Sequence, residues 1–183
     1  MSLLPPHTFA TYFRGLDLAT VTGAFAEAGL PARTAGDTSG WAWVTHDAGS
    51  TPVGGRVQEL AQQLTGFRYA DRVLGPGPAE SVFLASTPPC TCPHGQHYSV
   101  PQCDEHPIQF MYSRDGFGET YFNVGRRRET RRCGDLLVRE LLEAGIVGRD
   151  TPGYDADPDF NADGARTLRL IATRFELPPL LSA

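Results

Sequence analysis

The sequence contains no lysine, so all 16 of its basic side chains are arginines. A phosphate-binding loop built on a lysine, a Schiff-base lysine and a lysine general base are therefore excluded. Isoleucine and asparagine are also scarce, whereas alanine, glycine, proline and arginine are abundant. Because the codons of the scarce residues are rich in A and T, the composition predicts a GC-rich genome, such as that of an actinobacterium or its phage.

Long apolar runs are also lacking, and none approaches the roughly 18 residues that a membrane span needs. The opening MSLLPPHTF has no basic segment before an apolar one, so we expect no secretory signal and a cytoplasmic location. With 40% hydrophobic and 20% charged residues, the chain is typical of a globular protein, and we expect a single domain over 1–183. Its net charge of −5 disfavours a protein that coats nucleic acid.

Apolar spacing predicts the secondary structure. Spacings of three and four residues indicate helices over 17–28, 56–64, 131–144 and 165–175, and the last of these is also compatible with a strand over 167–173. Strands are expected over 41–45, 81–85, 108–113 and 119–124, and an Asp-Gly step favours a hairpin between the last two. The pattern predicts an α+β fold, with an antiparallel sheet of about four strands and three or four helices packed on one face.

A Cys/His-rich loop over 88–107 is the most informative segment, because it holds three of the four cysteines and three of the five histidines. Cysteine and histidine are the usual ligands of structural zinc, which takes four of them. We favour His97 as the fourth ligand, since it lies far enough from Cys92 for the chain to turn back. The candidate Zn²⁺ ligands are Cys90, Cys92, His97 and Cys103, with His94 and His106 as alternatives.

Other interpretations of this loop stay open. A disulfide is disfavoured by the expected cytoplasmic location, and the residues need not bind metal at all. A catalytic zinc would need a nearby base, for which Asp104 and Glu105 are candidates, but the zinc deaminase and H-E-x-x-H patterns are absent. Cys133 lies beside Arg132 and is a further zinc ligand, a reactive thiol or an inert buried side chain.

An acidic loop over 150–164 contains the sequence Asp159-x-Asn161-x-Asp163-Gly164, which matches the first half of an EF-hand calcium loop. The second half does not match, because Leu170 stands where the bidentate glutamate belongs. One interpretation is a weak Ca²⁺ or Mg²⁺ site formed by Asp159, Asn161 and Asp163. The alternative is an acidic turn in which Asp163 caps the following helix.

A basic cluster precedes the helix expected over 131–144. Guanidinium groups and helix N-termini both favour anions, so a phosphate, a nucleic-acid backbone or an acidic partner is a candidate ligand. The alternative is a solvated helix start whose charges pair with nearby acidic residues. The cluster consists of Arg126, Arg127, Arg128, Arg131 and Arg132.

Taken together, these features favour a small cytoplasmic binding or regulatory protein with a zinc-stabilised loop, acting through contacts with a protein partner. The first alternative is a metal-dependent hydrolase of a phosphate-containing substrate, with Glu105 or Asp104 as the base. A weaker alternative is a nucleic-acid binder that uses the basic cluster.

Overall fold

The computed structural model of the chain describes residues 4–5, 7–47, 51–66, 68–69, 72–73, 79–86, 108–114, 117–124, 132–133, 136–148, 151–157 and 159–179. This part of the chain contains no helix long and apolar enough to cross a membrane. In chain order its elements are β1 (Thr8–Arg14), α1 (Leu18–Glu27), β2 (Thr34–Thr38), β3 (Trp41–Asp47), α2 (Thr51–Leu64), β4 (Arg68–Tyr69), β5 (Arg72–Val73), β6 (Glu80–Ser86), β7 (Ile108–Arg114), β8 (Phe117–Val124), β9 (Arg132–Cys133), α3 (Val138–Glu143), α4 (Pro152–Ala156) and α5 (Ala165–Phe175).

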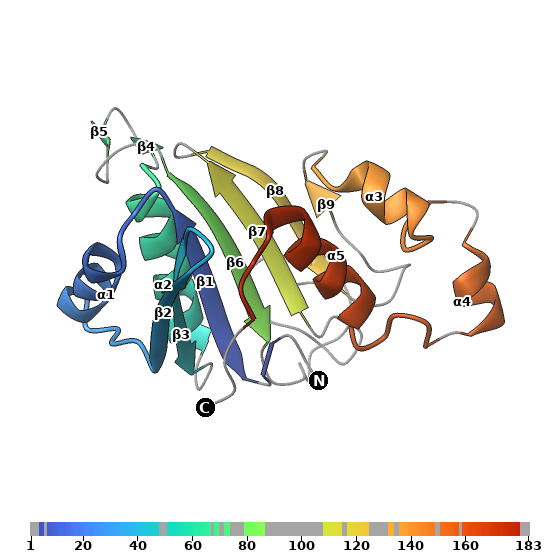
Figure 1. Ribbon diagram of the computed structural model, residues 1–183, viewed down its shortest axis with the longest axis horizontal. Helices are drawn as coiled ribbons and strands as arrows, with labels where there is room; N and C mark the ends of the chain where they lie inside the picture. The colour runs from blue at the N-terminus through green and yellow to red at the C-terminus, as the bar shows by residue number, and fades with distance from the viewer. Residues whose placement is uncertain are drawn as a thin grey trace.

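Seven strands form one antiparallel sheet in the order β2-β3-β1-β6-β7-β8-β9, and β4 pairs separately with β5 (Figure 1). Strand β1 lies between β3 and β6, where Tyr12 pairs with Trp43 of β3 on one side and with Val82 of β6 on the other. The α+β class expected from the sequence is confirmed, with more strands than the four expected.

The connections define a recognisable topology. In each of the segments β1-α1-β2 and β3-α2-β6, the two strands are separated in the sheet by one other strand. Strand β3 lies between β1 and β2, and strand β1 lies between β3 and β6. This β-α-β-β-α-β path with the order β2-β3-β1-β6 is the split, ferredoxin-like arrangement. Strands β7, β8 and β9 extend that unit beyond β6.

Both faces of the central strands are apolar and buried. In β1, Ala10 and Tyr12 belong to a cluster that includes side chains of α3 and α5, whereas Phe9 and Phe13 belong to a cluster that includes side chains of α1 and α2. Figure 1 shows α5 against β7, consistent with its Phe175 ring lying 4.9 Å from that of Tyr112. Helices therefore cover both faces of the sheet, and the expectation that they cover one face was wrong.

The individual elements agree with the sequence to different degrees. Helices α1 and α5, strands β3 and β6 and the β7–β8 hairpin lie where they were predicted, whereas α2 begins at Thr51, five residues early. The helix predicted over 131–144 is wrong in its first half, because Arg132 and Cys133 form β9. Leu137 then adopts a left-handed conformation (φ 68°), so helix α3 begins only at Val138.

Candidate functional site

The Cys/His loop joins two neighbouring strands of the sheet. Its predicted ligands lie outside the described residues, as do Asp104 and Glu105. The structure does place both ends of the connection, because β6 ends at Ser86, β7 begins at Ile108, and Ala85 pairs with Gln109. The two ends of the loop are therefore held next to each other at one end of the sheet. The predicted ligands in question are Cys90, Cys92, His94, His97, Cys103 and His106.

Strand β8, which precedes the basic cluster in the sequence, ends at the same end of the sheet. Strand β8 ends at Val124, which pairs with Ile108, the residue that follows the Cys/His loop. Residues Arg126, Arg127, Arg128 and Arg131 lie outside the described part of the chain.

The end of the basic cluster differs from its predicted position. Arg132 pairs with Phe122 and Cys133 pairs with Tyr121, so both residues lie in β9. The expectation that Arg132 stands at a helix N-terminus was therefore wrong. Because a β-strand has only a small net dipole, β9 adds little to the attraction of an anion.

Several strand ends meet at this end of the sheet. Thr8, the first residue of β1, pairs with Asp47 on one side and with Ser86 on the other. Farther across the sheet, Ala85 of β6 pairs with Gln109 of β7, and Ile108 of β7 pairs with Val124 of β8. The connections that carry the zinc and anion predictions thus leave from this end of the sheet.

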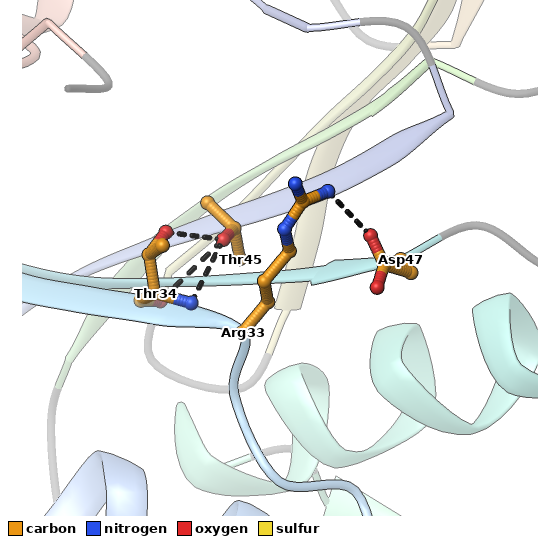
Figure 2. Close-up of polar contacts among 4 residues, drawn as sticks. All are labelled: Arg33, Thr34, Thr45 and Asp47. Carbon is orange, nitrogen blue, oxygen red and sulfur yellow. Dashed lines mark hydrogen bonds and ion pairs between the residues drawn. The ribbon is translucent and has the colours of Figure 1, made fainter. Parts of the chain in front are cut away.

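Asp47, which pairs with Thr8 at this end of the sheet, binds Arg33 (Figure 2). The Arg33 Nη1 donates to Asp47 Oδ1 over 2.6 Å, and 55% and 66% of the two side chains are exposed. Next to this pair, the hydroxyl oxygens of Thr34 and Thr45 lie 2.5 Å apart, and the Thr34 amide donates to Thr45 Oγ1. Exposed ion pairs contribute little to stability, so we assign these contacts no role beyond holding β2 next to β3.

His46 is the one buried histidine among the described residues, with 3% of its surface exposed. Its Nε2 lies 3.0 Å from the carbonyl oxygen of Leu30, which fixes the proton on Nε2, and its Nδ1 has no partner. Burial lowers the pKa of His46 below its usual value, although the Leu30 carbonyl and Asp47 both favour the protonated form. The ring packs 4.7 Å from that of Phe25, so a neutral imidazole in the core explains this arrangement.

The acidic loop is organised by its own backbone. The Asn161 side chain is buried; its Oδ1 accepts from the Arg166 amide over 3.1 Å, and its Nδ2 donates to Thr167 Oγ1 over 2.8 Å. Asp163 Oδ1 accepts from the amide of Ala165, the first residue of α5, whereas the N-cap residue of this helix is Gly164. Asp159 donates its amide to Asp157 Oδ1.

These contacts leave the cation site in this loop a prediction. Three or more histidine, cysteine, aspartate or glutamate side chains do not gather into a metal-binding group anywhere in the described residues. The Oδ1 of Asn161, which a cation would need, already accepts a hydrogen bond from the backbone of α5.

A groove between α3 and α5 was not predicted from the sequence. Its volume is about 390 Å³, and it is lined by Glu140, Arg169, Leu170, Thr173 and Arg174. The Arg174 Nε lies 3.5 Å from Glu140 Oε1, whereas the Arg169 side chain makes no hydrogen bond or ion pair within the described part of the chain. The signal available beforehand was that α5 carries three arginines and no acidic residue. The groove has a net positive charge and is chemically suited to carboxylates.

The comparisons with known proteins add no family to this description. No family model matches the chain, no curated protein is significantly similar to it, and no solved structure matches it significantly.

Proposed function

We propose that this protein is a binding or regulatory protein whose Cys/His loop between β6 and β7 holds a structural Zn²⁺ and contacts a protein partner. The thiolates of Cys90, Cys92 and Cys103 and the imidazole of His97 would complete a closed tetrahedral site. Bound there, the zinc would fix the loop as a rigid surface for recognition.

The observation that carries this proposal is the pairing of β6 with β7 at the base of the loop. Ala85 pairs with Gln109, and the Cα atoms of paired antiparallel residues lie about 5 Å apart. A loop whose ends are already held together has lost part of its closure entropy before it binds metal. The sheet thus supports a local zinc site without depending on the metal for its own fold.

The test is the zinc content of protein purified without added metal or a histidine tag. We expect one zinc per chain, retained in His94→Ala and His106→Ala and lost in Cys92→Ser, Cys103→Ser and His97→Ala. Cys133→Ser is the matched control, because it removes a cysteine that lies in β9. Circular dichroism should show the same strand and helix content in every variant, and an absence of zinc from the wild type would overturn the proposal.

A metal-dependent hydrolase is the second candidate, and the pairing of Val124 with Ile108 favours it. Arg126 and His106 each lie two residues beyond this pair, and two residues span at most about 7 Å, so arginines and loop can reach one phosphate ester. Zinc would supply a Lewis acid, and Glu105 or Asp104 would accept the proton of the attacking water.

Hydrolysis of p-nitrophenyl phosphate tests the second candidate. If the protein is a hydrolase, Glu105→Gln or Asp104→Asn abolishes turnover while the zinc content stays unchanged. If both variants retain turnover, neither Glu105 nor Asp104 is the base. If the wild-type protein contains zinc but shows no turnover, the binding function remains the explanation of the loop.

A further inference from the structure

Helix α5 lies beside α3 and carries three arginines and no acidic residue (Figure 1). Arg166 donates its Nε to the Phe160 carbonyl oxygen over 2.9 Å, and its guanidinium lies 4.1 Å from the centre of the Phe160 ring. The Arg174 Nε lies 3.5 Å from Glu140 Oε1 of α3. Within the described part of the chain, Arg169 is therefore the one arginine of α5 whose guanidinium has no partner.

Helical spacing places a second donor next to Arg169. Thr173 is four residues further along α5, so the two side chains are neighbours on the helix surface, and both line the groove between α3 and α5. The Thr173 hydroxyl makes no hydrogen bond to any residue that the structure describes. A guanidinium beside a free hydroxyl suits a carboxylate, which accepts hydrogen bonds from both.

The rest of the groove is apolar. Leu170 packs against the core cluster but is only partly buried, so part of its side chain lines the groove. Carbon atoms form most of the lining surface, and the volume of about 390 Å³ lies near the lower end of the range for small-molecule sites, roughly 300–1,000 Å³. A ligand that matches both parts has an anionic head and a short apolar tail.

Glu140 limits the charge that such a ligand can carry. Its carboxylate faces Arg174 on the α3 side of the groove and offsets the charge of that arginine. A second negative charge at the tail end of the ligand would approach Glu140 and be repelled. The groove therefore favours a monoanion over a phosphate ester, which carries more than one negative charge near neutral pH.

We propose that the groove between α3 and α5 binds a small monocarboxylic acid with a short apolar tail. The carboxylate accepts hydrogen bonds from the Arg169 guanidinium and the Thr173 hydroxyl, and the tail lies along Leu170 toward α3. None of these residues belongs to the Cys/His loop, so the site does not use the zinc proposed for that loop.

Titration with hexanoate tests this site, with the NMR shifts of the α3 and α5 amides as the readout. We expect saturable shifts in both helices. Hexanamide has the same tail but no charge, and acetate has the charge but almost no tail. Each should bind at least about tenfold more weakly than hexanoate, because each lacks one of the two contacts.

Arg169→Gln should weaken hexanoate binding about tenfold, because it removes the charged donor. Arg139→Gln is the matched control on α3. Arg139 pairs with Glu143, 86% of its side chain is exposed, and it does not line the groove. This variant should bind hexanoate like the wild type.

Glu140→Gln should change the preference between two ligands, which misfolding cannot imitate. Adipate has the chain length of hexanoate and a second carboxylate at the other end. The wild type should bind hexanoate more tightly than adipate, because Glu140 repels the second carboxylate. In Glu140→Gln the Arg174 guanidinium is free to bind that carboxylate, so the order of the two affinities should reverse.

Three results would overturn the proposal. The first is a wild type that shows no saturable binding of hexanoate; if an amidated peptide with one glutamate binds instead, the groove serves a protein partner. The second is equal binding of hexanoate and hexanamide, or unchanged binding of hexanoate in Arg169→Gln, since the carboxylate is then not recognised by this arginine. The third is a wild type that prefers adipate, or a Glu140→Gln variant that still prefers hexanoate.

Discussion

The indole Nε1 of Trp41 donates a hydrogen bond of 2.9 Å to the carbonyl oxygen of Phe175, although the two residues are 134 positions apart in the chain. The same carbonyl accepts from Arg14 over 3.2 Å, and the Arg14 guanidinium lies 4.3 Å above the Trp41 ring. The last turn of α5 is thus tied to β1 and β3, so the helix has a defined position on the sheet.

Trp41→Phe should destabilise the protein by more than its loss of volume explains. The substitution removes the donor to Phe175 and weakens the contact with Arg14, and a buried hydrogen bond contributes about 1 kcal/mol. We expect the free energy of unfolding, measured with urea, to fall by about 2–3 kcal/mol, the remainder coming from the smaller ring in the core. Trp43→Phe is the matched control, because Trp43 is equally buried and makes no such bond; an equal loss in both variants would contradict the assignment.

His46 should make the stability of the fold depend on pH. Burial lowers its pKa in the folded state, so below pH 6.5 the unfolded chain binds the proton more readily than the folded chain. The stabilising effect of neutral His46 is therefore complete above about pH 6.5 and is lost as pH falls from there toward the lowered pKa. Urea unfolding between roughly pH 5 and pH 8 measures this slope.

His46→Gln provides the control for this slope. The glutamine amide can still donate to the Leu30 carbonyl but does not titrate, so the variant should lose the His46 part of the pH dependence. The difference between the two proteins isolates His46 from the carboxylates, which titrate in both. If wild type and variant had parallel stability profiles over this window, the buried neutral state of His46 would be refuted.

Two adjacent glycines of α2 should respond to alanine with opposite signs. A Cβ at Gly54 would lie 2.5 Å from the Phe9 ring, whereas a Cβ at Gly55 meets nothing within 4 Å. Gly54→Ala should therefore destabilise the protein by about 1–3 kcal/mol through overpacking of α2 on β1. Gly55→Ala should stabilise it by about 0.5–1 kcal/mol, because alanine favours the helix. Urea unfolding measures both changes, and equal signs would mean that α2 does not approach β1 through Gly54.

The elements predicted correctly carry signals within their own segments. Asp17 accepts from the Thr20 amide and caps α1, and α5 has apolar residues on one face. Strand β1 was missed because its position between β3 and β6 needs apolar residues on both faces. Phe9, Ala10, Tyr12 and Phe13 follow this requirement and so lack the alternation that marks a half-buried strand.

The features of the candidate site likewise divide into those with a local sequence signal and those without one. The zinc ligands of the Cys/His loop could be proposed from the sequence because the motif is local, and they stay a prediction. The pairing of Val124 with Ile108, which sets the end of β8 beside the start of β7, depends on sheet register and has no local signal. The same holds for the groove, since Glu140 and Arg174 meet only after α3 and α5 have packed together.

Asn161 provides the last prediction, because it connects the acidic loop to α5. Asn161→Ala leaves the Arg166 amide and the Thr167 hydroxyl without their partners, so we expect a loss of about 2–3 kcal/mol in the free energy of unfolding. Thermal unfolding with calcium and with a chelator separates this role from cation binding. A purely structural Asn161 gives the same loss in both, whereas a calcium-dependent stabilisation of the wild type that disappears in Asn161→Ala would show that the side chain leaves Arg166 to bind the cation.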